Sequence, residues 1–233
     1  MATSLYHSDT SRISKSGLDL IRRAPRLFKH QRIDGNGSDD TKSTDFGSAA
    51  HCYILEHHAF YDRYQIGRDH GNKIPLKQHE YDHLVGMKQA LKQHPIASAL
   101  LFDGTNEVVH FWTDPITGVE CKMCADHLPA RFPKIISDYK TAKDASLRGF
   151  RSALRRYRYD VQGAFYLDGC KSREEFVFIV QETEPPYLIG CYALSADDIK
   201  NGRLQYMEDL AVYAECKRTN IWPDYNNNKI TTL

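Results

Sequence analysis

Apolar residues occur in short runs along the central and C-terminal parts of the chain, separated by polar segments rich in Gly, Pro, Asn and Asp. Runs of this length with many β-branched and aromatic residues predict β-strands. In Glu175–Gln181, the uninterrupted Phe, Val and Ile side chains favour burial on both faces. The predicted strands are 106–112, 119–126, one that begins at Ile135 and passes through Lys140, 175–181 and 187–194.

Longer segments with apolar positions three and four apart predict helices around these strands. The first covers about residues 10–30, with an apolar stripe around Leu18 and Ile21 and with Ser14 or Ser16 as its N-cap. The other predicted helices run from Ser43 or Thr44 to about His58, from Lys77 to His94, from Ala145 to Tyr157, through Gln162 and Tyr166, and from a cap at Ser195 to about Lys217.

The length of 233 residues is enough for one well-buried domain, and we expect residues 1–233 to form a single domain. Residues 31–43 are polar, contain glycine and lack periodicity, which predicts a flexible loop. The asparagine-rich segment 222–233 is expected to be a frayed tail or a contact arm.

Composition places the chain among ordinary globular proteins, with 41% hydrophobic and 26% charged residues. No apolar run approaches the ~18 residues of a membrane helix, and the N-terminus lacks a signal-peptide pattern. The six cysteines are widely spread, which favours reduced thiols over a disulfide framework. We therefore expect a cytoplasmic protein without a membrane partner.

The net charge of +1 excludes a globally basic nucleic-acid binder but allows a local basic surface. Arginines recur at spacings of three, four and three after the third strand, which places them on one helical face. This face is either solvated or a track for a nucleic-acid backbone, and the same alternatives apply to the basic residues of the first helix. The arginines in the spacing pattern are Arg148, Arg151, Arg155 and Arg158.

Two predicted strands carry acidic residues near a lysine, a pattern that fits either ordinary surface ion pairs or a divalent-cation site suited to phosphodiester hydrolysis. Asp138 and Lys140 are two positions apart and so point to the same face of their strand. Asp126 lies on the preceding strand, and a hairpin would bring it to Asp138. Two carboxylates beside a lysine predict a Mg²⁺ site, because Mg²⁺ prefers oxygen ligands and is usually held by one or two carboxylates. Glu107 or Glu120 could add an acidic ligand, but neither is required by the pattern.

Other potential metal ligands form weaker patterns. His79 and His83 are four residues apart, but no H-E-x-x-H motif or further ligand accompanies them. Cys121 and Cys124 form a single C-x-x-C on a predicted strand, where their side chains point to opposite faces. We expect both cysteines to be packing residues.

Asp126 followed by Asp138-Tyr139-Lys140 resembles the D…(D/E)xK signature of the PD-(D/E)xK nuclease superfamily. Three further segments occur in the order found in its RecB-like branch, and the N-terminal one is similar to the first helix of the RecE (exodeoxyribonuclease VIII) nuclease domain. These segments are 46–56, with G-S-A-A-H around His51, 157–166, with a Q-x-x-x-Y motif, and 6–26.

The resemblance implies an α/β fold, with a restriction-endonuclease-like central mixed β-sheet flanked by helices. It further implies a site in which one or two Mg²⁺ ions, or Mn²⁺, are held by side chains and one backbone carbonyl, with Lys140 and Gln162 completing the catalytic set. The implied ligands are His51, Asp126, Asp138 and the Tyr139 carbonyl. The residues expected to contact DNA, from the resemblance and from the arginine spacing together, are Ser14, Ser16, Arg22, Arg148, Arg151, Arg155, Arg158, Tyr166 and either Tyr157 or Tyr159.

The RecE resemblance also implies a biological role. RecE-like nucleases digest linear double-stranded DNA processively from 5′ ends, leave 3′ overhangs, form toroidal oligomers and act with a RecT-like single-strand annealing protein in phage recombination. Composition and spacing favour none of these properties by themselves. Two alternatives remain: a structure-specific or restriction-type endonuclease of the same fold, and a catalytically inactive module that binds DNA ends.

Overall fold

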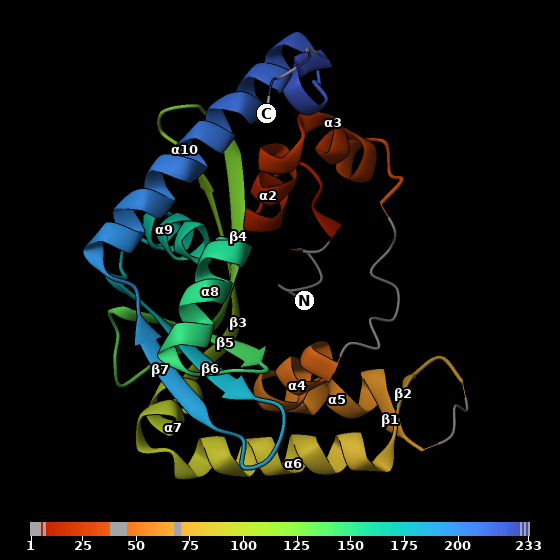
Figure 1. The fold of residues 1–233 in the computed structure, drawn as a ribbon, viewed down its shortest axis with the longest axis vertical. Coiled ribbons are helices and arrows are strands. Elements are labelled where there is room, and N and C mark those ends of the chain that lie inside the picture. The colour runs from red at the N-terminus through yellow and green to blue at the C-terminus, as the bar shows by residue number, and fades with distance from the viewer. Residues whose placement is uncertain are drawn as a thin grey trace.

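The computed structural model describes residues 6, 8–37, 46–67, 71–228, 230 and 232. Its centre is a five-stranded mixed sheet in the order β3-β4-β5-β6-β7 (Figure 1). Only β5 and β6 pair in parallel, and the other neighbours are antiparallel. The strands are β3 (Gly104–Thr113), β4 (Glu120–Pro129), β5 (Ile135–Ala142), β6 (Glu175–Glu182) and β7 (Ile189–Ala193). The predicted central mixed sheet is therefore confirmed.

The first hairpin, β3–β4, is closed by a turn that Asp114 organises. Its carboxylate Oδ2 accepts hydrogen bonds from the backbone N–H of Thr117 at 2.8 Å and from the Thr117 hydroxyl at 2.7 Å. Gly118 follows with a φ of 69°, a conformation that glycine adopts without steric cost. This turn sets the pairing register, in which Thr113 lies opposite Glu120.

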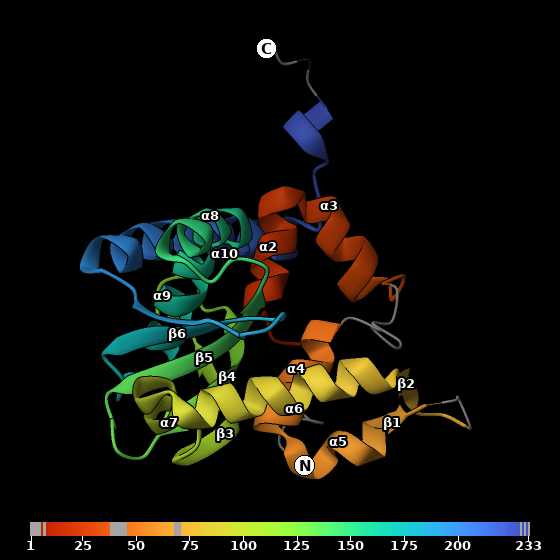
Figure 2. The same cartoon turned by 60° about the horizontal axis from the view of Figure 1, so that its bottom comes forward.

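Helices cover both faces of the sheet (Figures 1 and 2). Along β6, Phe176, Phe178 and Val180 pack into one hydrophobic core, whereas Val177 and Ile179 pack into the other. Burial on both faces explains why this strand is apolar without interruption over 176–180, as the sequence predicts. The first core includes side chains from α2 (Lys15–Arg23), α8 (Leu147–Tyr157), α9 (Tyr159–Gly169) and α10 (Ala196–Thr219).

The second core lies under a layer of helices from the N-terminal half of the chain. Its members include Phe60, and also Leu84, Met87 and Leu91, which recur with helical spacing along one helix. A small parallel sheet pairs β1 (Tyr64–Ile66) with β2 (Ile74–Leu76) at the edge of this layer. The helices are α4 (Phe46–Leu55), α5 (His57–Arg63), α6 (Gln78–Gln93) and α7 (Pro95–Leu101).

The single helix predicted for residues 10–30 is wrong, because the segment is broken at Pro25. Helix α2 ends at Arg23, Ala24 is extended, and α3 (Pro25–Phe28) continues into a π-helical turn, η1 (Lys29–Ile33). Proline lacks a backbone N–H and disfavours a helical residue before it, so the chain restarts there. Ser14 caps α2, since its hydroxyl accepts from the Gly17 N–H at 3.4 Å.

Three other expectations concern segment ends. The start of the predicted loop 31–43 is helical through Ile33, and residues 38–43 lie outside the described part of the chain. The expected start at Ser43 or Thr44 also lies outside it, and the predicted helix to His58 is divided at Glu56 into α4 and α5.

The tail predicted from residue 222 is anchored where it begins. The Trp222 ring stacks on Phe28 with centroids 5.9 Å apart, and the Arg26 N–H donates to the Pro223 carbonyl at 3.0 Å. A short 3₁₀ helix, η2 (Tyr225–Asn228), follows (Figure 2). Within the part of the chain that the structure describes, no helix combines the length and the apolar character needed to cross a bilayer.

Candidate active site

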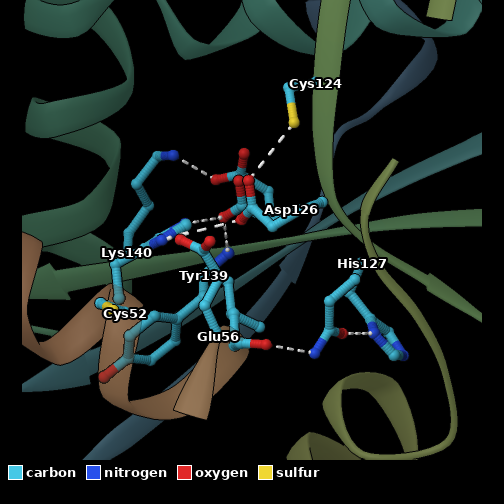
Figure 3. A network of polar contacts seen from close by, with 12 residues as sticks. Cys52, Glu56, Cys124, Asp126, His127, Tyr139 and Lys140 are labelled. Atoms are coloured by element: carbon cyan, nitrogen blue, oxygen red, sulfur yellow. Dashed lines mark hydrogen bonds and ion pairs between the residues drawn. The ribbon is translucent and has the colours of Figure 1, made fainter. Parts of the chain in front are cut away.

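Asp126 and Asp138 face each other on the neighbouring strands β4 and β5, as the hairpin prediction requires. The bridge between His127 and Ser137 sets a register in which these two aspartates are opposite. Asp126 Oδ2 accepts a hydrogen bond from the backbone N–H of Tyr139 at 2.9 Å (Figure 3). The same oxygen lies 3.1 Å from Nε2 of His51, which α4 supplies. The structure thus brings His51, Asp126 and Asp138 to one place.

Asp138 is buried and contacts two further residues of the predicted site. Its side chain is 1% exposed and forms an ion pair with the Lys140 ammonium. Its second oxygen accepts from Nε2 of Gln162, on α9, at 2.5 Å. Lys140 also lies over the ring of Tyr159, 5.3 Å from its centroid. Lys140 and Gln162 therefore fix the orientation of the Asp138 carboxylate.

Glu107, which the sequence left open beside Glu120, is the acidic residue that joins this group. The pairing of Asn106 with His127 and of Val108 with Ala125 places Glu107 opposite Asp126. Counting back from the turn between β3 and β4 would have identified it, because Thr113 pairs with Glu120. Glu120 lies at the other end of this hairpin, where it accepts from the Thr113 hydroxyl.

Three side chains could share a metal ion. His51, Glu107 and Asp126 each offer one ligand atom, and these atoms lie within 4.8 Å of one another. Of all described residues, they form the only such group of three or more histidine, cysteine or acidic side chains. An imidazole with two carboxylates suits Mn²⁺ as well as Mg²⁺, because imidazole favours transition metals and carboxylates suit both ions.

The electrostatics of the site also favour a cation. Burial and the charge of Asp126 raise the pKa of Glu107 to about 7 and that of Asp138 to about 6. Burial alone would lower the pKa of His51, but the adjacent Asp126 outweighs it and raises that pKa to about 9. Burial opposes ionisation of Asp126, yet His51 lowers its pKa to about 2. Clustered buried carboxylates with raised pKa values are the environment that a bound divalent cation stabilises.

A hydrogen-bond chain ties the strand that carries Glu107 to the helix that carries His51. Asn106 Nδ2 donates to the carbonyl of Leu55, the last residue of α4, at 2.6 Å. Its amide oxygen contacts the buried His127 ring, whose other nitrogen lies 3.3 Å from the Asp103 carbonyl. These contacts fix β3 relative to α4, and with them the separation of the two side chains.

The site opens into a cavity of about 430 Å³. His51, Lys140, Arg63 and Tyr159 contribute to its walls. A second hollow of about 720 Å³ shares Lys140 and Tyr159 with it and extends to Arg156 and Tyr157 on α8. Lys140 can therefore be reached from the side of α8.

Several predicted DNA-contacting residues lie on this side. Arg148, Arg151 and Arg155 are exposed on α8 and line a hollow of about 790 Å³, to which Arg156 also contributes. Tyr157 is half-exposed at the end of the same helix. The structure thus groups three of the four arginines of the predicted stripe near the route into the site.

The fourth arginine of the predicted stripe does not lie on this face. Helix α8 ends at Tyr157, and Arg158 has a left-handed backbone with φ 54°. Its guanidinium turns inward to Asp19, at 2.9 Å, and to the buried Asp209. The prediction of a four-arginine face is therefore wrong for Arg158, because the helix ends before the spacing can be completed.

Replacing Arg158 by methionine should destabilise the fold by about 3 kcal/mol, because it leaves Asp209 buried without its main cationic partner. Chemical denaturation of Arg158→Met and Arg155→Met would measure this effect. The exposed Arg155 should change the free energy of unfolding little. Equal stability of the two variants would contradict a structural role for Arg158.

The remaining predicted contacts differ in their accessibility. Tyr166 is buried and meets Phe176 edge to face, so it packs in the core and does not face solvent. Arg22 is half-exposed and pairs with Glu208 at 3.0 Å. Ser14 is the N-cap of α2, and the Ser16 hydroxyl lies 3.0 Å from that of Ser14.

Comparisons with known proteins agree with this architecture. A crystal structure from Eubacterium rectale, named "Putative exonuclease", aligns with a TM-score of 0.72 at 13% identity, over 100% of this chain and 94% of that chain. The structure of SSO0001 aligns with a TM-score of only 0.39 at 16% identity, over 88% and 80% of the two chains. No curated protein matches. Residues 14–231 match the model of the family described as "PDDEXK-like domain of unknown function (DUF3799)". The chain belongs to this PDDEXK-like family.

Proposed function

We propose that this protein is a metal-dependent exonuclease that hydrolyses phosphodiester bonds of linear double-stranded DNA. The observation that carries the proposal is the convergence of Asp126, Asp138, Lys140 and His51 at one place, beside a cavity that His51 and Lys140 line, in a PDDEXK-like fold. The Eubacterium rectale structure of similar fold, named "Putative exonuclease", supports the same class of activity.

Each residue has a role that follows from its contacts. His51, Asp126, Asp138 and the Tyr139 carbonyl would hold one or two Mg²⁺ or Mn²⁺ ions, which when bound polarise the phosphate and acidify the attacking water. The Lys140 ammonium supplies a fixed positive charge for the transition state and orients that water. The Gln162 amide keeps the Asp138 carboxylate in place through its 2.5 Å hydrogen bond.

We assign DNA binding to the arginine surface of α8. Arg148, Arg151, Arg155 and Arg156 line one hollow, and Arg156 also lines the adjoining one that reaches Lys140. Guanidinium groups bind phosphate without reading the base, so binding should be independent of sequence and strongly sensitive to salt.

Arg151→Gln and Arg155→Gln should each weaken DNA binding and reduce the slope of log K against log salt by about 1. Fluorescence anisotropy with end-labelled DNA at several salt concentrations would measure the slope, with Arg218→Gln, on the exposed end of α10, as the matched control. An unchanged slope in both α8 variants would place the DNA elsewhere.

The finer features of the proposal rest on the RecE resemblance of segments 6–26, 46–56 and 157–166. We propose digestion that is processive, runs 5′→3′ and leaves 3′ overhangs for recombination with a RecT-like annealing protein. A toroidal homo-oligomer, one nuclease domain over residues 1–233 and a cytoplasmic location belong to the same proposal.

Linear DNA labelled at its 5′ or 3′ end, incubated beside a covalently closed circle, tests the direction and the end requirement. Early release of the 5′ label with an intact circle is the expected result. Cutting of the closed circle would favour the endonuclease alternative. Binding of ends without cleavage would favour the inactive end-binding module.

A further inference from the structure

Glu107 has a place in the site that the D…(D/E)xK signature does not account for. It lies on β3, the edge strand next to β4, and its side chain is 16% exposed. Its two oxygens have different surroundings. Oε2 accepts from the Cys124 thiol at 3.3 Å, a weak hydrogen bond, whereas Oε1 lies 3.8 Å from Nδ1 of His51.

The surroundings of Oε1 are unusual for an oxygen of a buried carboxylate. Glu107 Oε1 is inaccessible to solvent and has no hydrogen-bond partner in the described part of the chain. Burying a carboxylate oxygen without a donor is costly, so such an atom calls for an explanation, of which a bound ion is one. Two charged groups lie near Glu107. The negative one is Asp126, opposite on β4, and the positive one is His51, which at 3.8 Å is beyond hydrogen-bond distance.

The backbone at Glu107 holds the side chain in this place. Its φ is 52°, inside a strand, and a residue other than glycine rarely adopts this conformation. The bonds of the neighbouring Asn106 to Leu55 and His127 keep the strand in register around it. An unfavourable conformation that surrounding contacts maintain is a feature often found at ligand sites.

We propose that Glu107 is a metal ligand, which together with His51 and Asp126 forms a position for a divalent transition-metal ion such as Mn²⁺. The three ligand atoms lie within 4.8 Å of one another, and one imidazole with two carboxylates is a donor set that suits such an ion. The ion accounts for the unpartnered oxygen and for the close approach of two carboxylates. Asp138, whose two oxygens are engaged by Lys140 and Gln162, lies beside this position.

Mn²⁺ binding measured by calorimetry without DNA tests this inference directly. The Glu107→Gln variant preserves size and removes the charge, and it should bind Mn²⁺ at least about tenfold more weakly than the wild type. Glu120→Gln, an exposed change on β4, is the matched control and should bind like the wild type. Wild-type affinity in Glu107→Gln, or no Mn²⁺ binding by the wild-type protein, would overturn the inference.

A second variant, Glu107→Gly, keeps the test decisive if Glu107→Gln does not fold. Glycine adopts a positive φ without strain, so Glu107→Gly should fold and also lose the affinity. If Glu107→Gln is unfolded by circular dichroism, the Glu107→Gly measurement decides.

This inference deepens the proposed function, but the two can fail separately. Glu107-dependent Mn²⁺ binding by a protein that does not cut DNA would uphold the ligand and reject the nuclease. Metal-dependent cleavage by the wild type, together with unchanged Mn²⁺ binding by Glu107→Gln, would uphold the nuclease and reject Glu107 as a ligand.

Discussion

Lys140→Met is expected to reduce DNA cleavage by about a hundred- to a thousand-fold, the effect of removing one fixed charge that stabilises a transition state. Lys140 is not a metal ligand in this account, so Mn²⁺ binding should persist. The variant should also be about 3 kcal/mol less stable, because Asp138 stays buried without its cation. Single-turnover cleavage and chemical denaturation measure the two effects.

A double variant separates stability from catalysis. Lys140→Met with Asp138→Asn removes both charges and should recover most of the lost stability, because an uncharged amide needs no buried cation. Cleavage should remain at the level of the single variant or below. Wild-type cleavage by Lys140→Met would remove Lys140 from the catalytic set.

Asp126→Asn is expected to have the largest effect, a loss of cleavage of about a thousand-fold or more, since metal ions contribute several kcal/mol to such reactions. Asp126 contacts His51, accepts a hydrogen bond from the Tyr139 amide and lies opposite Glu107 on the neighbouring strand. Asparagine keeps the shape and can still accept from the Tyr139 N–H, so folding should persist.

The measurement for Asp126→Asn pairs nuclease activity with Mn²⁺ binding. Both should fall together, because the side chain acts through the ion. The exposed Asp62→Asn provides the control and should match the wild type in both. A variant that loses Mn²⁺ binding but cleaves DNA normally would contradict the role assigned to Asp126.

Local patterns predicted the part of the site that depends on short-range geometry. The two-residue period of a strand places Asp138 and Lys140 on one face, and the hairpin brings Asp126 opposite Asp138. His51 lies at the site, as the family resemblance implies, because its helix α4 packs against β5. The continuous apolar run of β6 predicted a central strand covered on both faces.

Features that depend on long-range contacts were not predicted from the sequence. Spacing alone put Arg158 on the arginine face, but its left-handed backbone and the buried Asp209 turn it inward. Glu107 is preferred over Glu120 only when the strand register is counted back from the turn that follows β3, and its positive φ leaves no signature in a sequence that lacks glycine there. The break before Pro25 was visible in principle, because proline disfavours a preceding helical residue.

We expect the protein to use a bound metal to hydrolyse DNA from its ends. Release of nucleotides from linear double-stranded DNA by the purified protein, in Mg²⁺, in Mn²⁺ and with EDTA, tests it most directly. We predict release with either metal and none with EDTA. Release that persists in EDTA, or a folded protein that releases nothing with either metal, would contradict the account.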